Sequence, residues 1–313
     1  MTGQHDNDYD VVVIGGGAAG LNAALMLARA RRTVAVVDAG APRNAPADGV
    51  HGLLGHDGIS PAELRDRGHA EVRRYGGHLV PGRVDAVRGE AGDFTVSLTN
   101  GARLHGRRVL VTSGLVDELP DEPGLRQRWG NDVVHCPYCH GWEVRDRPIG
   151  VLATGPMAIH QALLFRQWSD DVALFTHTST RLPDETMEQL AARKIRVWDG
   201  EVAAVEVADD RIAGLRLADG SLVEREVVVV ATRLVAHTDF LAELGLHPVD
   251  HPSGVGVHIP VDPAGRTDVA GVWAAGNVTE LMAQVGPAAA AGAAAATQIN
   301  ADLIEVDNQA ALA

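Results

Sequence analysis

The chain has 313 residues, 46% of them hydrophobic and 4% aromatic, and a formal net charge of −14. Its length allows two domains with cores of ordinary size, and its acidic balance argues against nucleic acid or an anionic membrane as a partner. Two cysteines are too few for a disulfide framework, and the lack of a leader sequence or of about 18–20 consecutive apolar residues predicts a cytoplasmic protein without a transmembrane segment.

The first predicted unit spans residues 10–38, DVVVIGGGAAGLNAALMLARARRTVAVVD. An apolar run over 11–14 predicts a buried strand, and helical spacing of apolar residues over 21–28 predicts a helix. A second apolar run over 34–37 predicts another strand. This order is typical of a parallel βαβ unit.

A glycine-rich turn joins the first strand to the helix. Gly15, Gly17 and Gly20 fit G-x-G-x-x-G, in which glycines allow a tight turn, close approach of a pyrophosphate and close helix–strand packing. Phosphates would lie on the N-terminus of the helix. About 20 residues further on, Asp38 ends the second strand, where a carboxylate can accept hydrogen bonds from a ribose. The predicted dinucleotide site comprises Gly15, Gly17, Ala18, Ala19, Gly20 and Asp38.

Further elements follow in order along the first half of the chain. Residues 39–60 are rich in Gly, Pro, Asn and His and predict a loop. Helical spacing resumes over 61–75, with Ser60 as the N-cap and Pro61 at the first helical position. Short strands are predicted at 84–87, 94–98 and 107–114.

The second half begins with an irregular stretch. Two prolines and a charge cluster over 115–132 predict a crossover between domains. Residues 148–177 then repeat the strand, glycine turn, helix and strand order. The remaining predicted elements are strands at 201–207, 212–217 and 226–231, then a strand at GVWAAGN and a long alanine-rich helix. The predicted fold class is α/β, with two Rossmann-like dinucleotide-binding domains, the second inserted into the first.

The glycine turn of the second unit is degraded. Ala153, Gly155 and Ala158 occupy the places of G-x-G-x-x-A, and Pro156 follows the remaining glycine. The next strand ends in LFTHTST, which offers neither an acid for an NAD ribose nor an arginine pair for an NADP phosphate, and Arg181 is the nearest cation. This pattern favours a domain that keeps its fold but binds NAD(P)H poorly or not at all.

Both cysteines lie in the stretch HCPYCHGWE, residues 135–143. Zinc needs four ligands and the sequence contains no second C-x-x-C, so we predict no metal. A reducing compartment would keep a structural disulfide open. The pattern favours a redox-active dithiol of Cys136 and Cys139, because the spacing can place one sulfur at a helix N-terminus, where its pKa falls and the reactive thiolate is favoured.

A histidine follows this pair directly. An imidazole titrates near neutrality, so His140 can take up or return a thiol proton. The predicted catalytic residues are Cys136, Cys139 and His140. Trp142 is expected to pack under the C-x-x-C, and the alternative is that it shapes the substrate entrance. The sequence assigns no role to three other histidines: His51, His56 and His135.

Three features stand in one order: the glycine fingerprint, the C-x-x-C at the start of an inserted second unit, and GVWAAGN near the C-terminal end. This order resembles the low-molecular-weight thioredoxin reductases of the pyridine-nucleotide disulfide oxidoreductase family. The resemblance implies a homodimer that binds FAD through residues 1–115 and 240–313, with an NAD(P)-binding-like domain over 116–239 carrying the C-x-x-C. It also implies that Cys139 faces the flavin while Cys136 exchanges with substrate.

The same resemblance adds cofactor-binding residues near the C-terminal end. The family's AAGD is AAGN here, so Asn277, after Gly276, would meet the ribityl and phosphate groups with an amide instead of a carboxylate. Gln284 and Val285 match positions that approach the isoalloxazine ring. FAD is therefore the expected cofactor.

Two departures from the reductases suggest a particular branch. The residue after the second cysteine is His140 instead of aspartate, and the NADPH-site residues are missing. The motif CPYCHG, together with a second domain that lacks the NADPH-site residues, looks more like the gliotoxin- and holomycin-type dithiol oxidases. This resemblance implies an FAD-dependent dithiol–disulfide oxidoreductase that closes a disulfide through Cys136 and Cys139 and passes electrons through FAD to O2 or another acceptor.

Other functions are compatible with the sequence. One is an NAD(P)H- or ferredoxin-dependent disulfide reductase of the thioredoxin reductase type, one is a redox-sensing flavoprotein, and one is a flavin-binding module without catalysis. The substrate is a small-molecule dithiol or disulfide, or a thioredoxin-like protein.

Overall fold

A computed structural model describes residues 7–155, 157–179 and 181–313. The expectations for the extreme N-terminus and for Pro156 lie outside the described residues. The chain forms two compact units: unit 1 comprises Met1–Ala45, Gly58–Val116 and Leu234–Ala313, and unit 2 comprises Pro46–Asp57 and Asp117–Arg233. Each contains a parallel sheet with a strand–helix–strand unit, so the predicted α/β class is confirmed.

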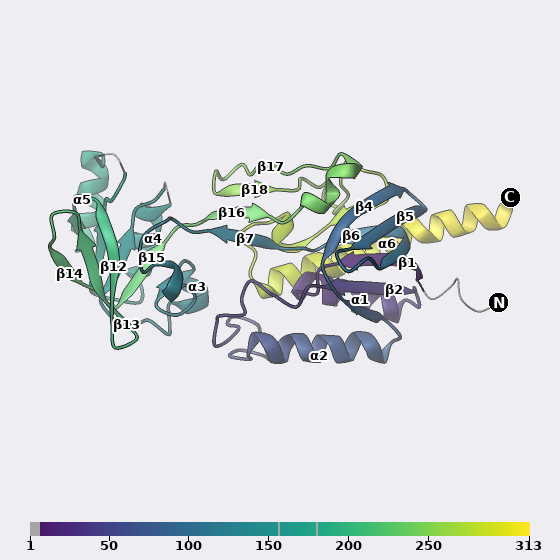
Figure 1. The fold of residues 1–313 in the computed structure, drawn as a ribbon, viewed down its shortest axis with the longest axis horizontal. Helices are drawn as coiled ribbons and strands as arrows, with labels where there is room; N and C mark the ends of the chain where they lie inside the picture. The colour runs from purple at the N-terminus through teal and green to yellow at the C-terminus, as the bar shows by residue number, and fades with distance from the viewer. Residues whose placement is uncertain (1–6, 156, 180) are drawn as a thin grey trace. The chain divides into compact units, whose positions relative to one another are not determined.

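The main sheet of unit 1 contains β1 (Asp8–Ile14), β2 (Val34–Asp38), β3 (His78–Pro81), β4 (Val84–Glu90), β5 (Asp93–Leu98), β6 (Arg103–Val111) and β19 (Val272–Ala274). Its parallel part runs in the order β3-β2-β1-β6, and β19 pairs with the end of β6. The antiparallel hairpin β4–β5 pairs with the beginning of β6 (Figure 1). In this order the carboxyl ends of β1 and β2 lie at one edge, next to the glycine turn.

The helices of unit 1 are α1 (Ala18–Arg29), α2 (Pro61–Arg74) and α6 (Val285–Leu312), with 3-10 turns η2 (Asp239–Leu244) and η3 (Gly276–Val278). The start of α2 is as predicted: Pro61 is its first residue, and the Ser60 hydroxyl accepts a hydrogen bond from the backbone N–H of Glu63 at 3.1 Å. Such a cap satisfies one of the unpaired N–H groups of the first turn.

The core of unit 1 lies on both faces of the sheet. Val11 and Val13 face α1 and α6, whereas Val12 and Ile14 face the opposite side. All four are almost completely buried. Because strand side chains alternate between faces, an apolar run without alternation indicates a strand covered on both sides, which explains the sequence VVVI.

The alanine-rich helix α6 packs directly on α1. A Cβ atom built at Gly292 would lie 2.0 Å from the carbonyl oxygen of Ala19, so the two backbones approach closely there. The Asn22 side chain donates a hydrogen bond to the carbonyl of Ala289 at 2.7 Å. Small side chains in α6 are what permit this distance, and the helix belongs to the core of unit 1.

Replacing Gly292 by alanine is therefore expected to destabilise unit 1. The added methyl group would meet backbone that cannot turn aside, and overpacking of this kind costs about 1–3 kcal/mol. Urea unfolding measures the change, with Ala294→Ser at an exposed position of the same helix as control. Equal stability of the Gly292→Ala and Ala294→Ser proteins would contradict the close packing.

Unit 2 has a parallel sheet and an antiparallel one. The parallel sheet runs in the order β11 (Arg196–Trp198), β10 (Val172–Phe175), β9 (Ile149–Leu152), β15 (Val227–Val230), β8 (Val133–Val134). The antiparallel sheet consists of β12 (Val202–Ala208), β13 (Arg211–Leu217) and β14 (Leu222–Glu224), and the helices are α3 (Pro137–His140), α4 (Ala158–Phe165) and α5 (Asp184–Ala192). The predicted second repeat is confirmed as β9-α4-β10.

Short elements account for the differences from the sequence prediction. The stretch 115–132, predicted as irregular, contains β7 (Leu115–Glu118) and η1 (Arg126–Arg128). β7 shares a small sheet with β16 (Arg233–Ala236), β17 (Val249–Asp250) and β18 (Gly256–His258). Strands of two to four residues are too short to show a hydrophobic period.

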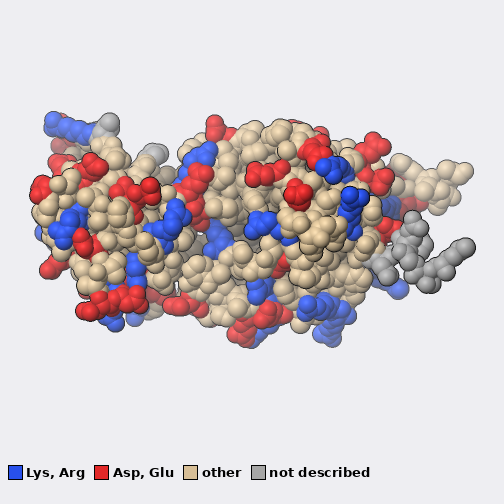
Figure 2. All heavy atoms as spheres, viewed as in Figure 1, with Lys and Arg blue, Asp and Glu red and all other residues tan. Residues whose placement is uncertain are grey.

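The surface carries charges of both signs. On the face drawn in Figure 2, acidic and basic side chains are interspersed. Within residues 7–155, 157–179 and 181–313, no helix combines the length and apolar character that crossing a bilayer requires.

Candidate active site

The glycine turn after β1 is shaped by close backbone contacts. Gly15 has φ +114°, and a Cβ there would lie 2.2 Å from the carbonyl oxygen of Thr112. A Cβ at Gly20 would lie 1.9 Å from the carbonyl oxygen of Gly15. Both positions therefore require glycine for the turn and for packing of α1 on β1, as the fingerprint predicts.

Gly17 differs from its neighbours because the space beside it is open. No described atom outside its chain neighbours lies within 4 Å of a Cβ built there, and α1 begins at the next residue, Ala18. The free N–H groups of the first turn of α1 can bind a phosphate. An open approach to a helix N-terminus fits the pyrophosphate of a dinucleotide.

Asp38 lies against the same turn. A Cβ at Gly16 would come within 2.5 Å of the Asp38 carboxylate, so the middle glycine, which the fingerprint leaves unassigned, makes room for this side chain. The carboxylate accepts a hydrogen bond from Gly40 N–H at 2.9 Å and lies 3.5 Å from His69 Nε2. Its remaining lone pairs suit a ribose, and His69 is a neighbour that sequence reasoning missed.

The C-terminal segment reaches the same turn. A Cβ at Gly276 would lie 2.8 Å from the Cβ of Ala19. The side-chain amide of Asn277 donates to the carbonyl of Ala283 at 2.8 Å, so it also holds its own loop in shape. Gln284 is the N-cap of α6 and Val285 its first residue. Gly276 and Ala19 are thus brought together within unit 1.

The C-x-x-C forms a single helical turn after β8. Cys136 is the N-cap of α3, and its carbonyl accepts hydrogen bonds from the N–H groups of Cys139 and His140 at 3.3 and 3.1 Å. The sulfurs of the pair lie 2.7 Å apart. A bond of about 2.05 Å can form from this arrangement with a small movement. Within the described part of the chain, no group of three or more His, Cys, Asp or Glu residues is arranged to hold a metal ion.

His140 lies partly buried at the end of this turn. Both ring nitrogens are buried and have no hydrogen-bond partner among the described residues. Burial lowers the pKa of the imidazole below its ordinary value; the Glu143 carboxylate opposes the shift and His51 adds to it. The Cys136 carbonyl also favours the protonated ring, although it does not reach hydrogen-bonding geometry. A neutral imidazole with unused nitrogens can act as a base for a thiol.

The aromatic surroundings of the turn differ from the expectation. The prediction that Trp142 packs under the C-x-x-C is wrong: its side chain is 65% exposed, with the Arg145 guanidinium 4.2 Å from the ring centroid. Trp168 lies there instead, because a Cβ at Gly141 would come within 2.8 Å of its ring. His135 stacks on Trp129, with ring centroids 5.4 Å apart, which gives it a packing contact.

Two histidines of the loop before α2 lie in unit 2 with the C-x-x-C. His51 Nε2 is 3.4 Å from Glu143 Oε1, and His51 Nδ1 is 3.5 Å from Asp57 Oδ1. His56 is exposed. Glu143 was missed by sequence reasoning, since only the fold brings His51 to it.

The sequence model of the pyridine nucleotide-disulphide oxidoreductases matches residues 9–296. The chain belongs to this family. It is similar to thioredoxin reductase tcpT of Claviceps purpurea (strain 20.1), 34% identical over 95% of this chain and 96% of that protein. Thioredoxin reductase sirT of Leptosphaeria maculans is 31% identical over 96% of this chain and 95% of its own length. The crystal structure of HlmI has a TM-score of 0.92 and 48% identity, covering 100% of this chain and 98% of that one.

The oxidoreductase is thus a thioredoxin reductase-like, FAD-dependent disulfide enzyme, as the order of its motifs predicts. Unit 1 supplies features that fit FAD: an open helix N-terminus at Gly17 and an acid, Asp38, beside it. Unit 2 supplies the redox pair Cys136 and Cys139.

In unit 2 of the oxidoreductase, side chains join the carboxyl ends of the parallel strands. Thr154, after β9, donates to the carbonyl of Ala231, after β15, at 3.0 Å. Ser179, after β10, donates to the carbonyl of Ala153 at 2.9 Å. In open parallel sheets a dinucleotide binds outside these carboxyl ends. In the oxidoreductase, internal hydrogen bonds of Thr154 and Ser179 take up part of this region.

His177, which follows the end of β10 by two residues, also uses its side chain within the protein. His177 Nδ1 accepts a hydrogen bond from Val202 N–H at 3.1 Å, and its Nε2 is 3.2 Å from Glu122. The side chain is 3% exposed. Arg181 is 92% exposed and lies 3.8 Å from Asp184. Among the residues described at this place, His177 stands where an acid would meet a ribose, and Arg181 is the nearest cation.

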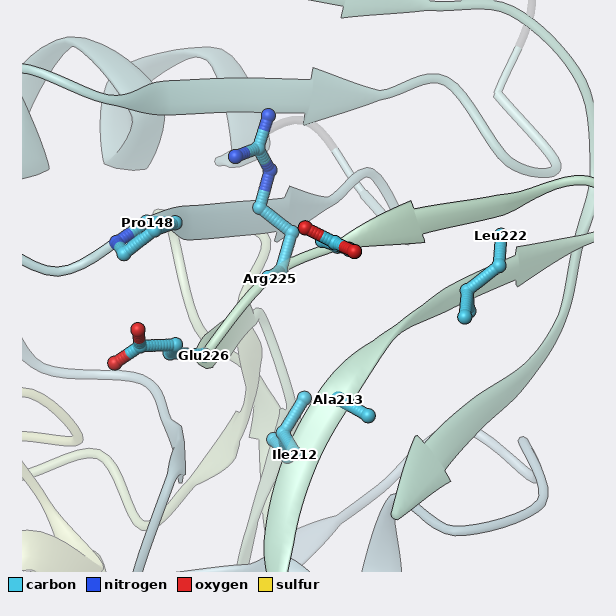
Figure 3. A pocket seen from close by; sticks show the side chains of 7 residues that line it. Pro148, Ile212, Ala213, Leu222, Arg225 and Glu226 are labelled. Carbon is cyan, nitrogen blue, oxygen red and sulfur yellow. The ribbon is translucent and has the colours of Figure 1, made fainter. Parts of the chain in front are cut away.

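The oxidoreductase also has a shallow surface pocket of about 320 Å³ in unit 2, drawn in Figure 3. None of the predicted site residues lines it. Arg225 lines it, but its guanidinium points away from Ile212 and Ala213 in Figure 3 and pairs with Asp171 at 3.1 Å. Glu224 and Glu226 line the same hollow, so it offers nothing to an anionic cofactor.

Proposed function

We propose that this oxidoreductase is a dithiol oxidase, which converts a dithiol and O2 into a disulfide and hydrogen peroxide. The proposal rests on the carboxyl ends of the parallel strands of unit 2. There, the side chains of Thr154, Ser179 and His177 form hydrogen bonds to the backbone of the protein. The described residues of this edge do not supply the usual contacts of a nicotinamide donor. In the proposed reaction, the electrons come from the thiols of the substrate.

The residues of the chain divide the work as follows. FAD, when bound, accepts two electrons from the dithiol pair and passes them to O2. With Cys136 and Cys139 joined as a disulfide, a substrate thiol gives its proton to His140 and its sulfur attacks Cys136. The bond between the cysteines breaks, and its electron pair goes to Cys139.

The second half of the exchange completes the balance. The other thiol of the substrate loses its proton and attacks the substrate sulfur of the mixed disulfide, which releases Cys136 as a thiolate. The substrate leaves as a disulfide, two protons have been released, and two electrons remain on the cysteine pair. The sulfur separation of 2.7 Å supports this role, because it places the two sulfurs within reach of disulfide formation.

A reductase that draws electrons from NAD(P)H is the runner-up. It is favoured by the relatives, since tcpT and sirT both carry the name thioredoxin reductase. It requires a donor site in unit 2 and a disulfide substrate, such as a thioredoxin-like protein. The same experiment separates the two functions.

The test is anaerobic mixing of the purified flavoprotein with NADPH, NADH or dithiothreitol, followed by flavin absorbance. We expect the dithiol alone to bleach the flavin, and admission of air to restore the colour with one hydrogen peroxide per flavin. Rapid bleaching by NADPH would overturn the oxidase and support the reductase. Failure of the flavin to turn over repeatedly in air would favour a redox sensor.

The lowered pKa of His140 predicts the pH dependence of this reaction. A histidine whose pKa is lowered stays neutral, and so able to accept a proton, at pH values below the ordinary imidazole pKa of about 6.5. We expect the rate of dithiol reduction to hold as pH falls through 6.5 and to decline only below it. His140→Gln should slow the reaction about 100-fold. Stopped-flow rates from pH 5 to 8 check both, and a decline centred above 6.5 would contradict the first.

A further inference from the structure

Three ionisable side chains act on the charge of His140, and the proposed chemistry uses none of them. Glu143 and Asp48 favour its protonated form, and His51 disfavours it. Asp48 and His51 come from the loop 46–57, whereas Glu143 comes from the turn that follows α3. The backbone carbonyl of Cys136 is the other polar group acting on the ring.

The position of Glu143 follows from the backbone. Val144 N–H donates to the carbonyl of His140 at 3.1 Å, so the helical turn continues past the end of α3. Residues three apart in a helical turn lie on the same side. Glu143 therefore lies on the side of the turn that carries His140.

His51 holds this carboxylate from the other side. Its Nε2 lies 3.4 Å from Glu143, and its Nδ1 lies 3.5 Å from Asp57. Asp57 in turn accepts a hydrogen bond from Gly52 N–H at 2.9 Å, which fixes the loop around the imidazole. A histidine between two carboxylates has a defined orientation, because each ring nitrogen has its own partner.

We propose that Glu143 stabilises His140 in its protonated form during thiol–disulfide exchange, and that His51, which pairs with Glu143, limits this effect. This rests on the proposed function, because it assumes that His140 takes up the thiol proton. The proton moves from a substrate S–H to a ring nitrogen of His140, and no electrons move in that step.

The physical reason is the cost of a charge on a buried ring. Burial favours the neutral imidazole, which suits a base but opposes the imidazolium that the reaction produces. A nearby carboxylate lowers that cost. Glu143 is 40% exposed, so water and salt weaken its field. A carboxylate whose field is weakened by exposure assists the proton transfer and still leaves His140 neutral before the substrate reacts.

The two residues act on His140 with opposite signs, and this makes the proposal testable. Histidine Cε1–H NMR signals of the intact flavoprotein would be followed from pH 4.5 to 8 at low salt, with the His140 signal assigned by its loss in His140→Gln. Glu143→Gln is expected to lower the pH at which His140 titrates by about half a unit. His51→Gln is expected to raise it, because His51 disfavours the protonated form of His140 and because Glu143 loses its partner in the variant.

A matched control comes from the same unit. Glu226 also carries a carboxylate, but it pairs with Arg147 and is not among the groups that act on His140. Glu226→Gln should leave the titration of His140 unchanged. The proposal would be overturned if His140 titrated at the wild-type pH in both Glu143→Gln and His51→Gln. It would also be overturned if the two variants shifted the titration of His140 in the same direction.

The rate of dithiol reduction provides a second readout. In Glu143→Gln we expect a slower reaction near neutral pH, with the difference from wild type shrinking as salt is raised, because a partly exposed charge is screened. Equal rates at all salt concentrations would overturn the role in proton transfer. If dithiols do not reduce the wild-type flavin at all, the proposed function fails instead, while the opposite NMR shifts still report the charge coupling.

Discussion

An enzyme with serine in place of Cys139 is expected to stay yellow when a dithiol is added. A serine oxygen cannot form the disulfide that the 2.7 Å sulfur separation allows, so no thiol exchange can reach the flavin. The rate of anaerobic bleaching by dithiothreitol should fall on the order of 1000-fold or more, as expected when a covalent catalyst is removed. Stopped-flow flavin absorbance measures it.

The matched control lies between the two cysteines. Tyr138 is 63% exposed and its ring meets Trp168 edge-on, so Tyr138→Phe keeps the ring and removes only the hydroxyl. We expect it to bleach within about threefold of the wild-type rate. Bleaching of Cys139→Ser at the rate of Tyr138→Phe would show that dithiols reduce the flavin without the cysteine pair.

Replacing Gly17 by alanine is expected to weaken FAD binding without unfolding the protein. Because the space beside Gly17 is open, a methyl group fits the protein but stands where the pyrophosphate would approach α1. We expect the Kd for FAD to rise about tenfold or more, which corresponds to about 1.4 kcal/mol. Titration of the flavin-depleted protein with FAD, followed by flavin fluorescence, measures this change.

The degraded turn of unit 2 supplies the control. Gly155 also has open space beside it among the described residues, and it occupies the equivalent place in the second repeat. Gly155→Ala should leave FAD affinity and dithiol reduction unchanged. If Gly17→Ala binds FAD as tightly as Gly155→Ala does, the phosphate is not bound at this turn. By contrast, Gly20→Ala should destabilise the fold itself, since its Cβ would lie 1.9 Å from the carbonyl of Gly15.

Features that are contiguous in the chain could be predicted from sequence. The strand, glycine turn, helix and second strand over 8–38 form one local unit, and its hydrophobic period and glycine spacing are visible directly. The cap of α2 by Ser60 is local as well. The C-x-x-C pair and its neighbour His140 were recognisable because thiol chemistry needs few residues at a short spacing.

Features that depend on distant segments could not be predicted. His51 and Glu143 meet only because the loop 46–57 packs with unit 2. The contact between Gly292 and Ala19 requires α6 to lie on α1. The hydrogen bonds of Thr154 and Ser179 join the ends of separate strands, and neither residue type signals such a role by itself.

The arrangement of the two units along the chain has a consequence for biosynthesis. Unit 2 is complete once Arg233 has been made, whereas unit 1 still lacks its last segment, Leu234–Ala313, which contains β19 and α6. Domains tend to fold as units in the order in which the ribosome delivers them. We therefore expect unit 1, whose synthesis starts first, to complete its folding after unit 2. Until α6 emerges, the apolar face of β1 at Val11 and Val13 has no cover from that helix, and a nascent chain in this state is a natural client for a chaperone.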